Sequence, residues 1–362
     1  MTATLVPDAP IDDLDHARHR GRTLLLITGL TLALALTLVV AAGLGPVSVP
    51  PGTVARIIGH HVFGHPVTVD WTTAQDSIVW LVRVPRVLLG ALVGAALAIT
   101  GAVLQTIVRN VLADPHILGV TSGASTGAAV YLLFGVTAAT TTTALTASAF
   151  LGALAATALL FAISRINGQL TSLRLLLGGV TIGYIFSAAT SFLIFASDQP
   201  EGARTVLFWL LGSLAPAAWT SVATTVTVVA LTLIAVLLMA PRLDALAAGD
   251  DTARTLGIAP NRIRLYALIV VALAVGSVVA VAGAIGFVGL IVPHVARLCT
   301  GGTHRRLVVT SALIGALFLV VADVAARTAF APRELPIGIV TAAVGAPLLL
   351  VLIRRFRAAG PS

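Results

Sequence analysis

The succession of long apolar runs is the feature of this chain that most constrains its fold. A helix needs about 20 apolar residues to cross the hydrocarbon core of a bilayer, and the first run, Leu24 to Leu44, has 21. Because the apolar core of a signal peptide has only about 7–15 residues, this run is interpreted as a transmembrane helix that the protein keeps. Candidate spans lie near residues 24–44, 87–108, 117–135, 143–164, 173–196, 219–240, 264–283, 285–300, 306–327 and 335–353.

These runs predict an all-α integral membrane protein with about ten transmembrane helices. The transmembrane domain is expected over residues 24–355, between polar tails at 1–23 and 356–362. The composition agrees, because 58% of the residues are hydrophobic and 10% are charged, against about 25% charged in a soluble domain.

All 22 basic residues, counting lysine and arginine together, are arginine. A P-loop requires a lysine on the nucleotide phosphates, so the chain is not an ordinary P-loop ATPase. Its one cysteine, Cys299, excludes an intrachain disulfide. We therefore expect neither ATP hydrolysis nor a disulfide framework in this chain.

The arginines also predict the orientation. Ten crossings place both termini on the same side, and if that side is the cytoplasm, 16 arginines lie inside and six outside. Short cytoplasmic loops are enriched in basic residues, so both termini are predicted to be cytoplasmic. The six outer arginines are Arg56, Arg83, Arg86, Arg204, Arg327 and Arg333.

Charged residues near the membrane are few. Arg83 and Arg86 form the motif RVPR before the second span, where they could extend to lipid headgroups. Asp323 precedes Arg327 by one helical turn, and an acidic residue at depth is a candidate proton relay. An ion pair with Arg327 on the same helix face is the favoured interpretation, and a proton-coupled secondary transporter remains the alternative.

The segment GHHVFGH contains His60, His61 and His65. Imidazoles are common metal ligands, but no carboxylate or cysteine lies among these three. A loosely structured external loop is the favoured interpretation, and no metal site is predicted.

Residues 240–265 form the longest inner segment and are interpreted as two short helices that dock another protein. The first is expected from Leu243 to Ala248 and ends at Gly249, and the second is capped by Asp250 and ends near Gly257. A passive linker is the less favoured alternative. The expected docking residues are three apolar anchors, three solvated charges and two glycines: Leu243, Leu246, Leu256, Asp250, Asp251, Arg254, Gly249 and Gly257.

Three motifs carry a family resemblance. They are RVPRVLLGALVGAALAITGAVLQTIVRNVLADPHILGVTSGA (83–124), GAIGFVGLIVPHVARL (283–298) and ELPIGIVTAAVGAP (334–347). Together they resemble the signatures of the FecCD permeases of iron-siderophore, haem and vitamin B12 ABC importers, and the similarity extends from residue 24 to 355. One departure is Val111, where the family commonly has proline.

The resemblance implies a type II ABC importer permease fold in a bacterial plasma (inner) membrane, and a transport subunit instead of an enzyme. The expected partners are two cytoplasmic ATP-binding subunits that hold ATP and Mg, an external substrate-binding lipoprotein, a second permease copy or sister permease, and membrane lipid, with no nucleic acid. This chain itself is expected to hold no cofactor. The expected cargo is a ferric siderophore, with cobalamin and haem as alternatives.

The resemblance also implies roles for particular residues. Arg83, Arg86 and Arg327 match outer positions that meet acidic groups of the binding protein, and segment 241–263 lies where the family places its coupling helices. The expected cytoplasmic gate comprises Asn110, Leu112, Thr171 and Ser172. The expected glycines of the pathway wall are Gly183, Gly338 and Gly345.

Overall fold

The computed structural model describes residues 13–45, 47–65, 68–135, 142–164 and 171–358, which form helices and connecting loops with no strand in these ranges. The α-helices are α1 (Asp13–Gly43), α2 (Pro51–Phe63), α3 (Thr73–Asp76), α4 (Val84–Val108), α5 (Val120–Phe134), α6 (Thr142–Ser164), α7 (Ser172–Phe195), α8 (Pro200–Leu210), α9 (Trp219–Ala248), α10 (Asp250–Thr255), α11 (Pro260–Ala282), α12 (Val288–Thr300), α13 (His304–Thr328) and α14 (Ile337–Ala358). A π-helical turn, Ser77–Arg83, joins α3 to α4, and a 3₁₀ turn, Pro115–Leu118, precedes α5.

Each predicted span coincides with one of these helices. Seven helical segments of the described residues are long and apolar enough to cross a bilayer, and Val120–Phe134, Val288–Thr300 and Ile337–Val351 are shorter apolar helices. The all-α membrane class is therefore confirmed, whereas the number of crossings stays a prediction.

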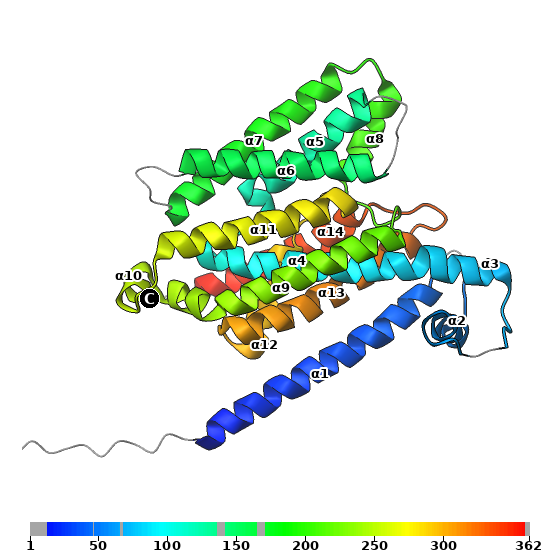
Figure 1. The fold of residues 1–362 in the computed structure, drawn as a ribbon, viewed down its shortest axis with the longest axis horizontal. Coiled ribbons are helices and arrows are strands. Elements are labelled where there is room, and N and C mark those ends of the chain that lie inside the picture. Colours follow the sequence, from blue (N-terminus) through cyan, green and yellow to red (C-terminus); the bar gives the residue numbers. More distant parts are fainter. Residues whose placement is uncertain (1–12, 46, 66–67, 136–141, 165–170, 359–362) are drawn as a thin grey trace, which may run out of the picture.

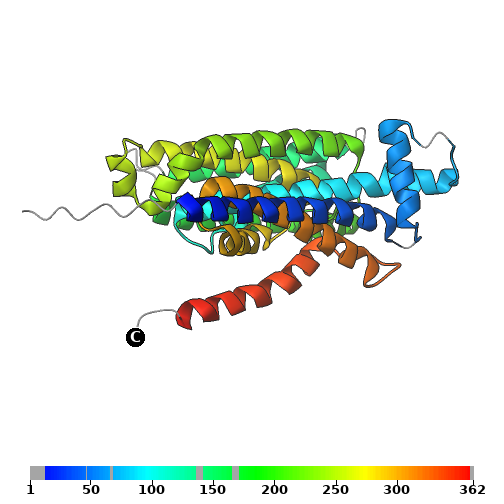
Figure 2. The ribbon, with the colours of Figure 1, turned by 90° about the horizontal axis from the view of Figure 1, so that it is seen from below.

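The ends of the helices define two ends of the molecule. The start of α1, α10 and the end of α14 lie together at one end, and α2 and α3 lie at the other (Figures 1 and 2). We call the end with α10 the inner end and the end with α2 the outer end. The cytoplasmic location of the inner end rests on the arginine distribution and stays a prediction.

Helix α4 is the centre of the core. In the most apolar 18-residue stretch of Thr73–Val108, 89% of the residues are buried. Glycines contribute to this burial because they let neighbouring backbones approach α4 closely. A Cβ on Gly94 would lie 2.2 Å from the carbonyl oxygen of Gly315 in α13, and one on Gly101 would lie 1.9 Å from that of Gly289 in α12. Small residues thus fix the contacts of α4 with α12 and α13.

Helices at the periphery are much less buried. Only 6% of the residues in the most apolar stretch of α1 are buried. Helix α1 crosses one side of the bundle as a separate rod (Figure 1). Helix α14 diverges from the bundle in the second view (Figure 2). Both helices leave broad apolar faces for lipid or for another protein.

One local prediction was wrong, and the bounds of the tails stay a prediction. Helix α1 begins at Asp13, so residues 13–23 of the N-terminal tail are helical, and residues 1–12 and 359–362 of the two tails lie outside the described residues. His60 and His61 belong to helix α2, so the prediction of a loosely structured loop is wrong for these two residues. The short helices α2 and α8 fell below the length used to recognise spans, and both start at proline, which suits the first turn of a helix.

Candidate functional site

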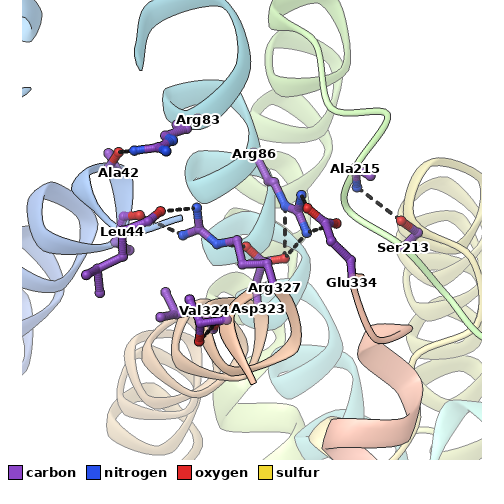
Figure 3. A network of polar contacts seen from close by, with 12 residues as sticks. Ala42, Leu44, Arg83, Arg86, Ser213, Ala215, Asp323, Val324, Arg327 and Glu334 are labelled. Atoms are coloured by element: carbon purple, nitrogen blue, oxygen red, sulfur yellow. Dashed lines mark hydrogen bonds and ion pairs between the residues drawn. The ribbon is translucent and has the colours of Figure 1, made fainter. Parts of the chain in front are cut away.

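Five charged residues meet at the outer end, and we call them the outer arginine cluster: Arg83, Arg86, Asp323, Arg327 and Glu334. Arg86 donates from Nε and Nη2 to Oδ1 of Asp323 at 3.0 and 2.9 Å, and from Nη1 to Oε1 of Glu334 at 3.0 Å (Figure 3). Nε of Arg327 lies 3.3 Å from Oδ2 of Asp323, which is an ion-pair distance without the alignment of a hydrogen bond. The predicted pairing of Asp323 with Arg327 is thus confirmed, and Arg86 is a second partner.

The other donors of this cluster hold the end of α1. The last carbonyls of a helix have no partner within it and carry partial negative charge. Arg327 donates to the carbonyls of Ala41 at 2.6 Å and Leu44 at 2.8 Å, and Arg83 donates to those of Ala42 at 3.2 Å, Gly43 at 2.8 Å and Val47 (Figure 3). Two arginines from α13 and the α3–α4 junction therefore fasten the peripheral helix α1 to the core.

The expected exposed rim of docking arginines is not present. Arg83, Arg86 and Arg327 are each less than one-tenth exposed, and each is bonded to α1 or to a carboxylate. The sequence alone suggested surface charges because the carbonyl partners of Arg83 and Arg327 and the carboxylate partners of Arg86 lie at least 36 positions away along the chain. Contact with a binding protein stays a prediction that requires these side chains to leave their present partners.

The two helical histidines belong to an aromatic cluster beside this end. Nε2 of His61 lies 3.1 Å from both carboxylate oxygens of Asp76, and its ring stacks on Trp80 at 4.3 Å. Nε1 of Trp71 donates to Asp76 at 3.0 Å. The carboxylate thus comes from a neighbouring helix, and no group of three potential metal ligands occurs among the described residues. His65 is exposed in the following loop.

At the inner end, one carboxylate joins two arginines, and we call Arg109, Asp250 and Arg264 the inner arginine network. Arg264 in α11 is 2% exposed and donates Nη1 and Nη2 to the two oxygens of Asp250 at 2.9 and 2.8 Å. Nη2 of Arg109 lies 2.8 Å from Oδ1 of the same carboxylate. Hydrogen bonds from Arg264 lower the pKa of Asp250, so this first residue of α10 is an anion at neutral pH.

The same network contacts both predicted gate segments. Arg109 has φ of 52° and ends α4, and in the turn that follows, Asn110 Oδ1 accepts the N–H of Leu112 at 2.9 Å. Nε of Arg264 donates to the Ile107 carbonyl at 3.2 Å, which also accepts the Ser172 hydroxyl at 3.1 Å. Thr171 caps the start of α7. The residues Asn110, Leu112, Thr171 and Ser172 therefore flank one connected inner structure.

The segment predicted to dock the ATPase differs from expectation in two ways. Leu243 and Leu246 are the buried end of the continuous helix α9, which extends to Ala248. Asp250 is held by two arginines, with its side chain 27% exposed, so it is not a solvated charge. Among the expected docking residues, the exposed ones are Asp251, Arg254, Leu256 and Gly257. The positive φ of 73° at Gly257 is the left-handed turn expected of a residue that ends a helix.

Two irregular segments meet inside the bundle. Residues 109–119 lead from α4 into α5, and residues 283–287 lead from α11 into α12. They border a cavity of about 320 Å³ whose lining includes Asp114, His116, Gly286 and Phe287. Helix α12 has 13 residues and spans about 20 Å at 1.5 Å per residue, so these segments supply the remaining depth. Irregular backbone at membrane depth is tolerated where protein or a water-filled cavity surrounds it.

The predicted pathway glycines flank this region but two of them do not leave open space. A Cβ on Gly345 would lie 2.5 Å from that of Phe287, and one on Gly338 would lie 2.4 Å from the Leu211 carbonyl oxygen. These two glycines permit close packing of α14 on neighbouring loops. At Gly183 the nearest atoms would be 3.8 Å away, so α7 has room there. Helices α7 and α14 thus pack against the two irregular segments, α7 near Gly119 and α14 at Phe287.

The profile of the FecCD transport family matches residues 31–355. The chain belongs to the FecCD transport family. The chain is 41% identical to the vitamin B12 import system permease protein BtuC of Vibrio cholerae, over 79% of this chain and 85% of that protein. It is 38% identical to the hemin transport system permease protein HmuU of Yersinia pestis, over 77% of this chain and 82% of that protein.

A solved structure has the same fold. An inward-facing metal-chelate type ABC transporter matches with a TM-score of 0.79 and 33% sequence identity, covering 91% of this chain and 98% of that chain. The predicted family, the type II importer fold and the role of a permease subunit are confirmed. This FecCD chain is a multi-pass ABC importer permease, and ATP hydrolysis belongs to a separate subunit. The relatives' names specify vitamin B12 and hemin, so a ferric siderophore is not confirmed as the cargo.

Proposed function

We propose that this permease forms the membrane pathway for a metal chelate that enters from the outer end, with cobalamin as the leading cargo. The observation that carries the proposal is the cavity where segments 109–119 and 283–287 meet. Broken helices that line a cavity at membrane depth are typical of transport sites. Identity of 41% to a vitamin B12 permease favours cobalamin over the ferric siderophore expected from sequence.

We propose that a cytoplasmic ATPase drives transport through α10. The exposed residues Asp251, Arg254 and Leu256 offer it charge and an apolar contact on one short helix. Asp250 of the same helix is ion-paired with Arg264 and Arg109. Movement of α10 would therefore act on the turn that holds Asn110 and Leu112, because Arg109 immediately precedes that turn.

An external binding protein and a second permease copy or a sister permease complete the proposed importer. Helices α7 and α14 expose large apolar side chains, among them Tyr184, Phe192 and Leu350. A second permease on these faces would cover these side chains. Contiguous apolar surface that a single chain leaves uncovered favours such an interface.

The alternative of a proton-coupled carrier is not favoured by the geometry. Asp323, the candidate relay, is paired with both Arg86 and Arg327. Two guanidinium groups occupy this carboxylate, and both would have to move away before it could relay a proton.

The proposed function is tested in proteoliposomes that contain the permease, its ATPase and its binding protein. We expect cobalamin uptake that requires ATP, stops with vanadate and survives an uncoupler. A ferric siderophore and hemin are offered in parallel to identify the cargo. Uptake that an uncoupler abolishes and vanadate spares would contradict an ATP-driven importer, and uptake of the siderophore alone would reject cobalamin.

A further inference from the structure

A second cavity, of about 520 Å³, opens at the inner end beside the α9–α10 junction. Its lining includes the side chains of Arg109, Arg297, Gln105 and Asn110 and the backbone of Gly249. The described residues that line it include two guanidinium groups and no carboxylate. The cavity therefore has a positive electrostatic potential, which attracts anions.

Arg297 is the group that points to a ligand. It lies in the last turn of α12 and is half-buried, and its Nη1 donates to Oε1 of Gln105 over a long 3.4 Å. Within the described residues Arg297 makes no ion pair, whereas Arg109 on the opposite wall shares Asp250. A guanidinium removed from water without an anion is unfavourable, so an anion in the cavity would stabilise Arg297.

The remaining polar groups of the wall are suited to the same role or already engaged. His304 is engaged, since its Nδ1 lies 2.5 Å from Asp244 and its Nε2 lies 2.7 Å from the Thr106 hydroxyl. Asn110 turns Oδ1 to the N–H of Leu112, which leaves its NH₂ group as the available donor. The free donors of the cavity are thus Arg297 and Asn110, with Arg109 adding charge.

We propose that this cavity binds a phosphate group, and that its main source is the headgroup of an anionic lipid of the inner leaflet. The planar fork of arginine matches phosphate oxygens with two hydrogen bonds. Basic pockets between transmembrane helices at the cytoplasmic side are typical sites for anionic headgroups. Leu298, next to Arg297, is 71% exposed and provides an apolar surface for an acyl chain.

Such a ligand would contact the parts that couple ATP hydrolysis to the pathway. Gly249 is the N-cap residue immediately before α10, and Asn110 belongs to the inner turn of the predicted gate. A phosphate bound between them links both segments to α12. We therefore expect bound anionic lipid to stabilise the inner end and to change the rate of transport.

The test measures lipid binding to the delipidated full-length chain by native mass spectrometry and by thermal unfolding. The ligands are phosphatidylglycerol, phosphatidylcholine and inorganic phosphate, each added alone. The test variant is Arg297→Gln. Arg305→Gln is the matched control, because Arg305 is an exposed arginine of the inner end that does not line the cavity.

We expect phosphatidylglycerol to bind the unmodified chain and Arg305→Gln equally, and Arg297→Gln about tenfold more weakly, because one charged hydrogen bond is lost. Stabilisation by inorganic phosphate alone, lost in Arg297→Gln, would assign the site to a soluble phosphate. Equal binding of phosphatidylglycerol to Arg297→Gln and Arg305→Gln, or equal binding of phosphatidylcholine and phosphatidylglycerol, would overturn the proposal.

A second pair of variants serves if Arg297→Gln does not fold. Val111 lines the cavity and is 40% exposed, so Val111→Glu adds a negative charge there without removing a buried contact. Val111→Gln is its neutral control. We expect Val111→Glu to lose phosphatidylglycerol and Val111→Gln to retain it; retention by both would also overturn the proposal.

Discussion

The outer arginine cluster and the inner arginine network use the same chemistry for different purposes. In the outer cluster, three buried arginines bind two carboxylates and the last carbonyls of α1. In the inner network, two arginines share Asp250, the first residue of a short helix whose other side is exposed. The outer cluster fastens a peripheral helix to the core, whereas the inner network joins α10 to α11 and to the end of α4. The comparison teaches that the elements an ion pair joins, more than the ion pair itself, decide its role.

The largest effect is expected from Asp323→Ala in the outer cluster. This change leaves Arg86 and Arg327 buried without their shared carboxylate, and breaking a buried pair costs about 3–5 kcal/mol. We expect a marked fall in the thermal unfolding midpoint of the detergent-purified chain. Glu334→Gln is the control with a small effect, because that side chain is 38% exposed. Equal midpoints for the two variants would show that the cluster is not structural.

The next effect is expected from Asp250→Ala in the inner network. The exposed docking residues remain, so ATPase assembly should persist while transport falls at least about tenfold, which corresponds to about 1.4 kcal/mol. Co-purification of the ATPase, ATP hydrolysis and cargo uptake are measured on the same preparation. Thr255→Ala is the matched control, since Thr255 is an exposed residue of the same helix outside the network. If Asp250→Ala lost ATPase assembly and transport to the same extent, Asp250 would act in ATPase docking, and its proposed role of connecting α10 to the inner turn would be contradicted.

A more local effect is expected from Arg327→Gln. The change removes donors to the carbonyls of Ala41 and Leu44, and each charged hydrogen bond contributes about 1.5–3 kcal/mol. We expect faster amide hydrogen exchange near the end of α1 with less change at α10. Arg333→Gln, at an exposed outer position, should leave exchange unchanged. Faster exchange at both ends alike would contradict a local fastening role.

The smallest effect is expected from pH. The pKa of Asp250 is lowered by Arg264, so its contribution is present above the unfolded value of about 3.9 and is lost as pH falls through the lower folded value. The ratio of transport by the unmodified chain to transport by Asp250→Ala should therefore stay constant between about pH 5.5 and 8. A ratio that falls steadily towards pH 5.5 would show that Asp250 is not held as an anion.

Local patterns predicted the framework but not the partners of the charged residues. Apolar runs located the helices because their length reflects bilayer thickness, and the spacing of Asp323 and Arg327 predicted their pairing. Arg83 was assigned to the surface because the carbonyls of α1 lie far away in sequence. Asp250 was assigned to solvent because its partner Arg264 lies in the next helix. The turn of Asn110 could be placed near the pathway through family resemblance, whereas its connection to α10 through Arg109 required the fold.

The most direct test of the linkage at the inner end is a distance between spin labels in the assembled transporter. Labels are placed at Val111 in the inner turn and Thr255 at the end of α10, in a Cys299→Ser background that removes the one native cysteine. We predict that the Val111–Thr255 distance is the same without nucleotide and in the vanadate-trapped state, while both labels move relative to α4. A Val111–Thr255 distance that changes by several ångströms between the two states would contradict the proposal that Asp250 passes the movement of α10 to the inner turn.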